Sequence, residues 1–193
     1  KAGVENYAYY ESKGYDKQYS KDGVIWADYE CTFPELSQNT TLYGHNWHNI
    51  YTPRTQANMQ ANDLMFSLVM SYNYTDFAQE NPFIYFSTTE QDYVFQVFAS
   101  YYTDLNFGYN YAQMSQEDFQ KVFAEAKAKS LSNYNVPVTS EDKIVTLSTC
   151  TRVHGNTNNQ RFVVMAKLVP VGTPSTTIST HSNPIAYNSS IDA

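Results

Sequence analysis

Apolar segments of strand length recur along this chain. Strict alternation of apolar and polar residues indicates a half-buried strand, whereas a short continuous apolar run indicates a strand covered on both sides. The pattern predicts six strands, over residues 24–29, 40–44, 83–88, 93–102, 143–149 and 161–169. The strand over 93–102 is apolar at most positions, so we expect both of its faces to be buried.

One helix is predicted clearly, over residues 115–131. Its apolar residues recur at helical spacing, at Phe119, Val122, Phe123 and Ala126. Ser115 and Asp118 form a start similar to a capping box, and Lys127 and Lys129 lie in the last turn, where cations favour the helix dipole. The sequence therefore predicts a mainly β fold with added helices.

The remaining segments are less regular. Short helices are predicted within residues 1–20 and over 64–72, and polar loops over 46–62 and 132–140. Residues 171–193 are rich in Ser, Thr, Asn and Pro, which predicts a loosely ordered tail. We find no internal repeat.

Composition narrows the class of protein. A length of 193 residues suits one domain, and 18 Tyr and 11 Phe favour β structure. The net charge is -7 and the basic residues are scattered, which argues against nucleic-acid binding. No apolar run approaches the ~18 residues of a membrane span, and no signal-peptide pattern opens the chain.

Cys150 is the candidate nucleophile. Cys31 and Cys150 are the two cysteines, and they either form a disulfide or are one inert and one reactive thiol. Cys150 ends an apolar strand and precedes the polar loop 154–159, so its side chain is expected at the rim of a sheet. A free thiol has a pKa of ~8.5 and needs a neighbouring base or cation to react as a thiolate. The alternative is a buried structural thiol.

His45 is the candidate base, because it follows a β-like run and a glycine in the segment Leu42-Tyr43-Gly44-His45-Asn46. A surface histidine without a role is the alternative interpretation. The other three histidines compete for the same role, and they are His48, His154 and His181.

Arg161 is the candidate oxyanion stabiliser. If 146–150 and 161–168 are adjacent strands, the eleven-residue step returns Arg161 beside Cys150. A guanidinium stays charged at any working pH and can bind the carbonyl under attack. Arg152, or an edge arginine paired to an acid, is the alternative.

Three separated segments together resemble the His, Cys and Arg motifs of the sortases, the cysteine transpeptidases of Gram-positive cell surfaces. They are residues 42–46, Thr146-Leu147-Ser148-Thr149-Cys150 and Arg161-Phe162-Val163-Val164. The resemblance covers roughly residues 5 to 170. The helix over 115–131 and the lead-in over 19–29 resemble those of class B sortases.

The resemblance implies a closed sortase-type β-barrel of seven to eight strands, with a helix inserted before the cysteine strand. Residues 1–170 would be the catalytic domain, lacking an N-terminal anchor and the first elements, and 171–193 a polar tail without a counterpart. The enzyme would act at the extracellular face of the cell membrane, anchored by the missing N-terminal segment.

The resemblance also implies a reaction and its partners. Cys150 would cleave the sorting motif of a secreted protein and pass the acyl group to an amine of a cell-wall precursor or, alternatively, to a pilin lysine. His45 would act as acid and base, and Arg161 would hold the oxyanion and the substrate.

Four further residues are implied to contact substrate. They are Ser148, Thr151, Asn6 and Tyr10, of which Tyr10 departs from the leucine of the related pattern and Thr151 stands where some class B relatives carry an acid.

Two other functions remain open from the sequence. One is a secreted cysteine protease that passes the acyl group to water, and the other is a non-enzymatic, Tyr-rich surface-binding domain. No His-Glu-x-x-His cluster and no phosphate-binding glycine loop occur, so neither a metal nor a cofactor is predicted.

Overall fold

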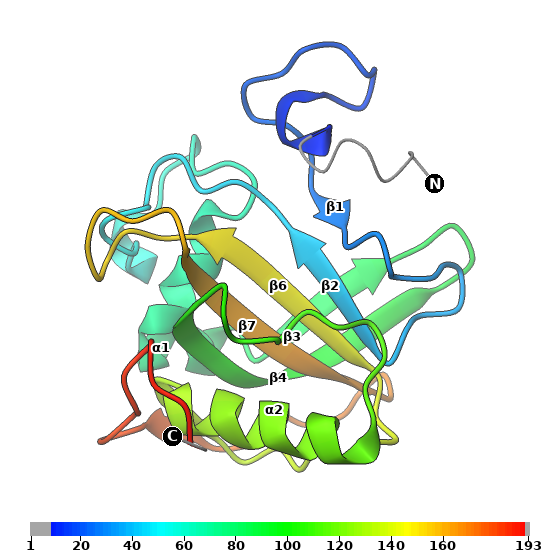
Figure 1. Ribbon diagram of the computed structural model, residues 1–193, viewed down its shortest axis with the longest axis vertical. Coiled ribbons are helices and arrows are strands. Elements are labelled where there is room, and N and C mark those ends of the chain that lie inside the picture. The colour runs from blue at the N-terminus through cyan, green and yellow to red at the C-terminus, as the bar shows by residue number, and fades with distance from the viewer. Residues whose placement is uncertain (1–8, 192–193) are drawn as a thin grey trace.

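Six strands form one sheet that curls into a half-barrel in the computed structural model, which describes residues 9–191 (Figure 1). Their order across the sheet is β1 (Trp26–Ala27), β2 (Asn39–Tyr43), β6 (Ile144–Cys150), β7 (Gln160–Val169), β4 (Asp92–Asp104) and β3 (Phe83–Ser87). β2 and β6 are parallel, and every other neighbouring pair is antiparallel. The sheet therefore has two edge strands, β1 and β3.

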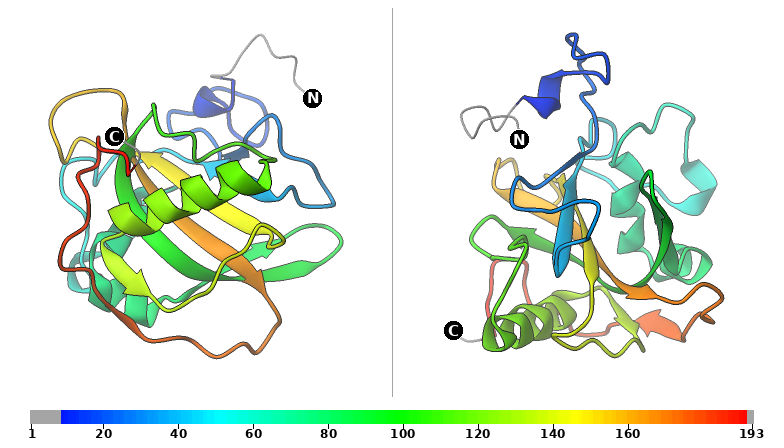
Figure 2. Two further views of the ribbon diagram at one scale, coloured as in Figure 1. Left: turned by 60° about the horizontal axis from the view of Figure 1, so that its bottom comes forward. Right: turned by 90° about the vertical axis from the view of Figure 1, so that its right-hand side faces the viewer.

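A second, smaller sheet joins two segments that are far apart in the sequence. β5 (Ser132–Tyr134) pairs antiparallel with β8 (Ile178–Thr180). The helices are α1 (Thr75–Glu80) and α2 (Gln116–Lys129), and the 3-10 turns are η1 (Tyr10–Ser12), η2 (Gln56–Asn58) and η3 (Ser67–Asn73). α2 crosses one side of the sheet (Figure 2, left), whereas η3 packs against β6 and β7.

The predicted start and buried face of α2 are confirmed. The Ser115 hydroxyl accepts a hydrogen bond from the Asp118 N–H at 3.1 Å, which satisfies one of the unpaired donors of the first turn. Phe119 and Phe123 are buried and stacked, with ring centroids 4.0 Å apart, and Phe123 also contacts Phe98 of β4. The helix is thereby fixed on the sheet through its apolar face.

The core lies around β4, β6 and β7. Ile144 and Val145 of β6, the run 162–166 of β7 and Phe95 of β4 are all essentially inaccessible to water. Strands buried on both faces read as continuous apolar runs, and this confirms the expectation for 93–102. Packing of these three strands sets their register, and the register in turn positions their ends.

Some local predictions differ from the structure. The predicted helix over 64–72 is mainly the 3-10 turn η3, with α1 following it, and β1 is only two residues long. The predicted loop 132–140 begins with β5, and β8 lies inside the tail expected to be loosely ordered. None of the helices within residues 9–191 combines the length and apolar character that crossing a bilayer requires.

Candidate active site

Cys150 and Arg161 are direct cross-strand neighbours. Cys150 is the last residue of β6, and the antiparallel register places it opposite Arg161 near the start of β7. The Cβ atoms of such a pair lie ~4.5–5.5 Å apart on one face. The eleven-residue step thus brings a thiol beside a guanidinium, as predicted.

His45 lies two residues beyond the end of β2, on the other side of β6. Tyr43 is paired with Ser148, and the pairing continues where the Gly44 N–H donates to the Ser148 carbonyl at 3.4 Å. The pairing of β2 with β6 ends there, and the next residues, including His45, follow β2 as a loop. Side chains two positions apart in a strand share a face, so Ser148 and Cys150 lie on the same side of β6. Cys150 therefore lies on the strand between the one that His45 follows and the one that carries Arg161.

The backbone around His45 is held from both sides. The Phe66 N–H donates to the His45 carbonyl at 2.9 Å. A Cβ at Gly44 would lie 2.7 Å from the Phe66 ring, so only glycine allows this approach. The Asn46 amide donates to the Cys150 carbonyl at 3.3 Å, which joins the histidine segment to the cysteine segment.

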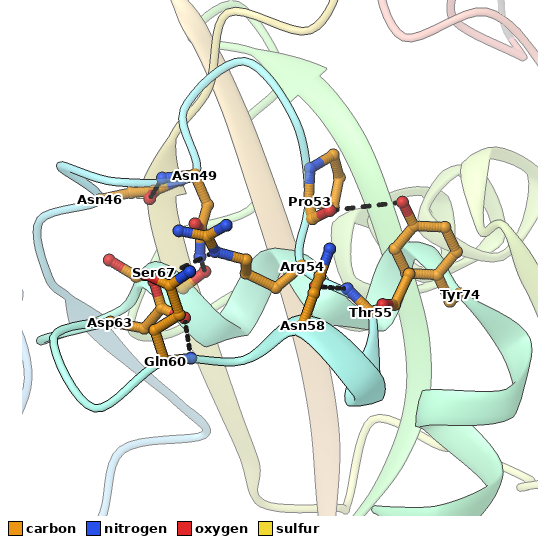
Figure 3. A network of polar contacts seen from close by, with 10 residues as sticks. All are labelled: Asn46, Asn49, Pro53, Arg54, Thr55, Asn58, Gln60, Asp63, Ser67 and Tyr74. Carbon is orange, nitrogen blue, oxygen red and sulfur yellow. Dashed lines mark hydrogen bonds and ion pairs between the residues drawn. The ribbon is translucent and has the colours of Figure 1, made fainter.

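The long loop after His45 is ordered by its own polar contacts (Figure 3). The Asn49 N–H donates to the Asn46 side chain at 3.0 Å, and the Asn49 side-chain amide donates to the Ser67 carbonyl at 2.9 Å. Arg54 and Asp63 form an ion pair at 3.3 Å across the loop. These contacts keep a polar segment in one conformation beside the site.

This loop also contacts the segment that follows Cys150. The Ile50 carbonyl accepts bonds from the Thr151 hydroxyl at 3.3 Å and from the Arg152 N–H at 2.6 Å. The loops after β2 and β6 are thus bonded to each other, which adds a second connection between the candidate base and the candidate nucleophile.

The His45 ring contacts the segment that precedes β1. Its Nε2–H donates to the Glu11 carbonyl at 2.8 Å. Because this hydrogen bond occupies Nε2, Nδ1 is the ring nitrogen left to exchange protons. Trp47 and Trp26 flank the ring, with centroid distances of 4.6 and 5.9 Å. A cavity of about 270 Å³ opens here, lined by Glu11, Ser12, Tyr19, Ser20, Lys21, His45 and Trp47.

The competing histidines lie in other surroundings. His48 is exposed, His154 stacks on Tyr187 at 4.6 Å, and His181 is hydrogen-bonded to the Ser130 carbonyl. None of the three shares the β2 register with Cys150.

Arg161 is held by carbonyl groups. Its Nη1 donates to the Asn158 and Gln160 carbonyls, each at 2.9 Å. Within residues 9–191, no carboxylate forms an ion pair with it, so its positive charge is not neutralised by a neighbouring acid. Arg152 instead bonds to its own loop, through the Thr151 carbonyl and the Asn158 side chain.

Tyr109 is a residue at the site that the sequence did not single out. Its hydroxyl and that of Ser148 are 2.7 Å apart, and both side chains are buried. Burial raises the pKa of Tyr109, the Ser148 hydrogen bond and the Arg161 charge lower it, and the neighbouring Cys150 raises it. Tyr109 therefore lies against Ser148, two residues before Cys150 on β6. It comes from the loop between β4 and α2, and no spacing rule connects such a loop to β6.

The residues implied to contact substrate lie in different surroundings. Ser148 is covered by Tyr109, and Thr151 is fully buried, bonded to the loop after β2. Tyr10 is 42% exposed in η1, next to the Glu11 carbonyl that holds His45. Asn6 lies outside the described residues.

The two cysteines do not form a disulfide. Both are free thiols, and the Cys31 sulfur contacts the Asn39 carbonyl at 3.8 Å. Over residues 9–191, no three His, Cys, Asp or Glu side chains gather closely enough to hold a metal ion.

Comparison with known proteins adds a family to this geometry. A model of the sortase domain matches residues 3–169. The chain is 29% identical over 163 residues to Sortase B of Staphylococcus aureus (strain NCTC 8325 / PS 47), which covers 84% of this chain and 61% of that protein. It is also 29% identical over 162 residues to Sortase B of Listeria monocytogenes serovar 1/2a (strain ATCC BAA-679 / EGD-e), covering 83% and 60%. The chain thus spans about 60% of the length of these curated relatives.

The fold agrees with this likeness. The solved structure of the Staphylococcus aureus sortase B–substrate complex superposes with a TM-score of 0.71 at 29% identity, over 86% of this chain and 71% of that one. The half-barrel described above is the architecture of sortase B structures.

Proposed function

Because the chain belongs to the sortase family, we propose that it is a cysteine transpeptidase that cleaves the sorting signal of a secreted protein and transfers the acyl group to an amine. The likeness to sortase B enzymes in sequence and fold supports the class B assignment. Such an enzyme meets its substrates at the extracellular face of the cell membrane, which is the location we propose.

The observation that carries the proposal is the order of three strand ends. Cys150 lies on the strand between the one that His45 follows and the one that carries Arg161, and it is paired with Arg161. A nucleophile, a proton-transfer group and a fixed cation are the parts that acyl transfer needs.

The reaction we propose has two halves. The Cys150 thiolate adds to the carbonyl carbon of the scissile bond, while Arg161 donates to the developing oxyanion. The His45 imidazolium then protonates the amide nitrogen, the C–N bond breaks, and the C-terminal piece leaves as an amine. In the second half an acceptor amine attacks the thioester, His45 takes its proton, and the C–S bond breaks to restore the thiolate.

We propose a cell-wall precursor peptide as the acceptor, with a pilin lysine as the alternative. Both present a primary amine, so the chemistry at Cys150 is the same and the difference lies in what the surface around the site binds.

Mass spectrometry of the protein with a panel of Pro-containing sorting peptides and candidate amines tests the proposal. We expect a thioester on Cys150, sensitive to hydroxylamine, and a ligated product with one class of amine. A thioester that yields only hydrolysed peptide, whatever amine is supplied, would identify a protease instead. Binding to a surface ligand that is unchanged in Cys150→Ala, without any thioester in the wild type, would indicate the non-enzymatic alternative.

Two variants test the roles of the other residues. His45→Ala should lower turnover by ~10²–10⁴, the usual contribution of a positioned acid–base group. Arg161→Ala should lower it by ~10²–10³ through loss of oxyanion stabilisation. Turnover close to that of the wild type in either variant would remove that residue from the mechanism.

A further inference from the structure

The C-terminal segment beyond the family match is bound to the domain along most of its length. β8 pairs with β5, and the Ile185 N–H donates to the Ala128 carbonyl at the end of α2 at 2.9 Å. Lys129 holds the segment further on, where its ammonium donates to the Tyr187 carbonyl at 2.9 Å. The family match ends at residue 169, so this segment is an addition to the common domain.

Part of this segment lies against the loop that joins Cys150 to Arg161. Tyr187 stacks on His154 with a centroid distance of 4.6 Å and an interplanar angle of 9°. The edge of Tyr102 meets the same imidazole at 4.8 Å. Figure 2, left, shows the red C-terminal segment rising to the yellow-orange loop between β6 and β7. His154 is thus held between a strand of the core and the C-terminal segment.

His154 is connected through its loop to the guanidinium of Arg161. The His154 N–H donates to the side-chain oxygen of the fully buried Gln160 at 3.0 Å. The Gln160 amide in turn donates to the Gly155 carbonyl at 2.7 Å. These bonds set the path of the loop, and the loop supplies the Asn158 carbonyl that accepts from Arg161 at 2.9 Å.

We propose that Tyr187 is a positioning residue for Arg161, acting through His154 and the loop over residues 151–159. The stack holds the loop in the conformation that presents the Asn158 carbonyl to the guanidinium. This inference rests on the proposed function, because the position of Arg161 matters to turnover only if Arg161 stabilises the oxyanion.

Single-turnover thioester formation tests the inference with three tyrosine variants. Tyr187→Ala removes the stack, and the usual strength of an aromatic pair predicts a fall in the rate constant of about three- to tenfold, with the half-saturating substrate concentration unchanged. Tyr187→Phe retains the stacked ring and should restore the wild-type rate. Tyr85→Ala, on the 76% exposed Tyr85 of β3, is the matched control and should leave the rate unchanged.

A double variant separates positioning from general destabilisation. If Tyr187 acts through Arg161, Tyr187→Ala should have no further effect on the rate in the Arg161→Ala background, because residues in one network are not additive. Full additivity of the two changes would overturn the proposed route, as would a rate unaffected by Tyr187→Ala alone.

Hydrogen exchange supplies a readout that does not depend on activity. We expect faster amide exchange over residues 151–160 in Tyr187→Ala and unchanged exchange in β6. Unchanged exchange over residues 151–160 would refute the proposal that Tyr187 holds this loop. A wild-type protein that forms no thioester would instead count against the proposed function, and the exchange result would still decide whether Tyr187 holds the loop.

Discussion

Lys129→Met should destabilise this protein far more than a surface lysine change would. The Lys129 side chain is 1% exposed and forms an ion pair with Glu125 at 3.4 Å. Its ammonium also donates to the carbonyls of Ala186 at 3.3 Å, Tyr187 at 2.9 Å and Ser189. Methionine fills a similar volume but leaves three carbonyls without this donor and the buried Glu125 carboxylate without a neighbouring positive charge, while the Ser190 hydroxyl still donates to that carboxylate at 2.8 Å.

The expected loss of stability follows from this burial. Removing one partner of a buried ion pair costs ~3–5 kcal/mol, because the remaining charge is left unpaired. The entropy of unfolding is ~2.1 cal/mol/K per residue, which for 193 residues gives ~0.4 kcal/mol/K. Dividing the cost by this entropy predicts a fall in Tm of ~7–12 °C.

The same helix provides the control. Lys121 and Glu117 form an ion pair with the same four-residue spacing at 3.0 Å, but their side chains are 55% and 78% exposed. An exposed pair contributes ~0.3–0.5 kcal/mol, so Lys121→Met should lower Tm by only ~1 °C. The assay is thermal unfolding followed by circular dichroism.

A second change tests the assigned cause. In the double variant Lys129→Met with Glu125→Leu, the unpaired carboxylate is gone and much of the lost stability should return. The reasoning is refuted if Lys129→Met and Lys121→Met shift Tm equally, or if the double variant is less stable than Lys129→Met alone.

Three further results are expected. Arg161→Lys should retain the fold, by circular dichroism, yet lower kcat/KM by ~10²-fold, because a planar fork of donors is replaced by a point charge; wild-type kcat/KM would contradict this. Tyr109→Phe leaves the buried Ser148 hydroxyl without its partner and should cost ~1–3 kcal/mol in urea unfolding, and an unchanged midpoint would exclude that bond as a contributor. Burial raises the pKa of Cys31, so in Cys150→Ala its alkylation by iodoacetamide at pH 7.5 should be slower than that of N-acetylcysteine and should rise only at higher pH; an equal rate would contradict the shift.

The long strands could be predicted from the sequence because their buried positions are occupied by apolar residues in a recognisable pattern. β6 and β7 are apolar runs covered on both sides, and their predicted ranges agree with the structure to within a residue. β5 and β8 could not be predicted in the same way. A three-residue strand contains too few positions to show a period, and this pair joins segments 44 to 48 residues apart, from Tyr134 with Ile178 to Ser132 with Thr180.

The predicted length of β1 was wrong for a local reason. After Ala27 the chain turns at Asp28, whose side chain accepts from the Glu30 N–H at 3.1 Å and whose carbonyl accepts from the Cys31 N–H at 3.0 Å. Aspartate side chains can bond to the backbone in this way and turn the chain away from its partner strand. The predicted strand over 24–29 therefore ends before Asp28 and Tyr29.

The residues of the candidate site also fall into some that could be predicted from the sequence and some that could not. His45, Cys150 and Arg161 lie at or just beyond the ends of strands, where an apolar run followed by a turn signal indicates their place. Tyr109 bonds to Ser148 from a loop and Tyr187 stacks on His154 from the C-terminal segment, so their positions depend on contacts with residues remote in sequence. Side chains of that kind could not be found from spacing.

The register of the core explains why the candidate site can be both partly exposed and well positioned. Leu42 and Leu147 are paired and buried, one residue before Tyr43 and Ser148. A slip of one residue between β2 and β6 would move these leucines to the opposite face, and Cys150 would turn with its strand. Burial of the leucines therefore penalises a one-residue slip away from the register that pairs Tyr43 with Ser148. Because the reactive groups contribute little to that burial, they can be exchanged without loss of the fold, whereas a polar residue at Leu147 should impair stability and alignment together.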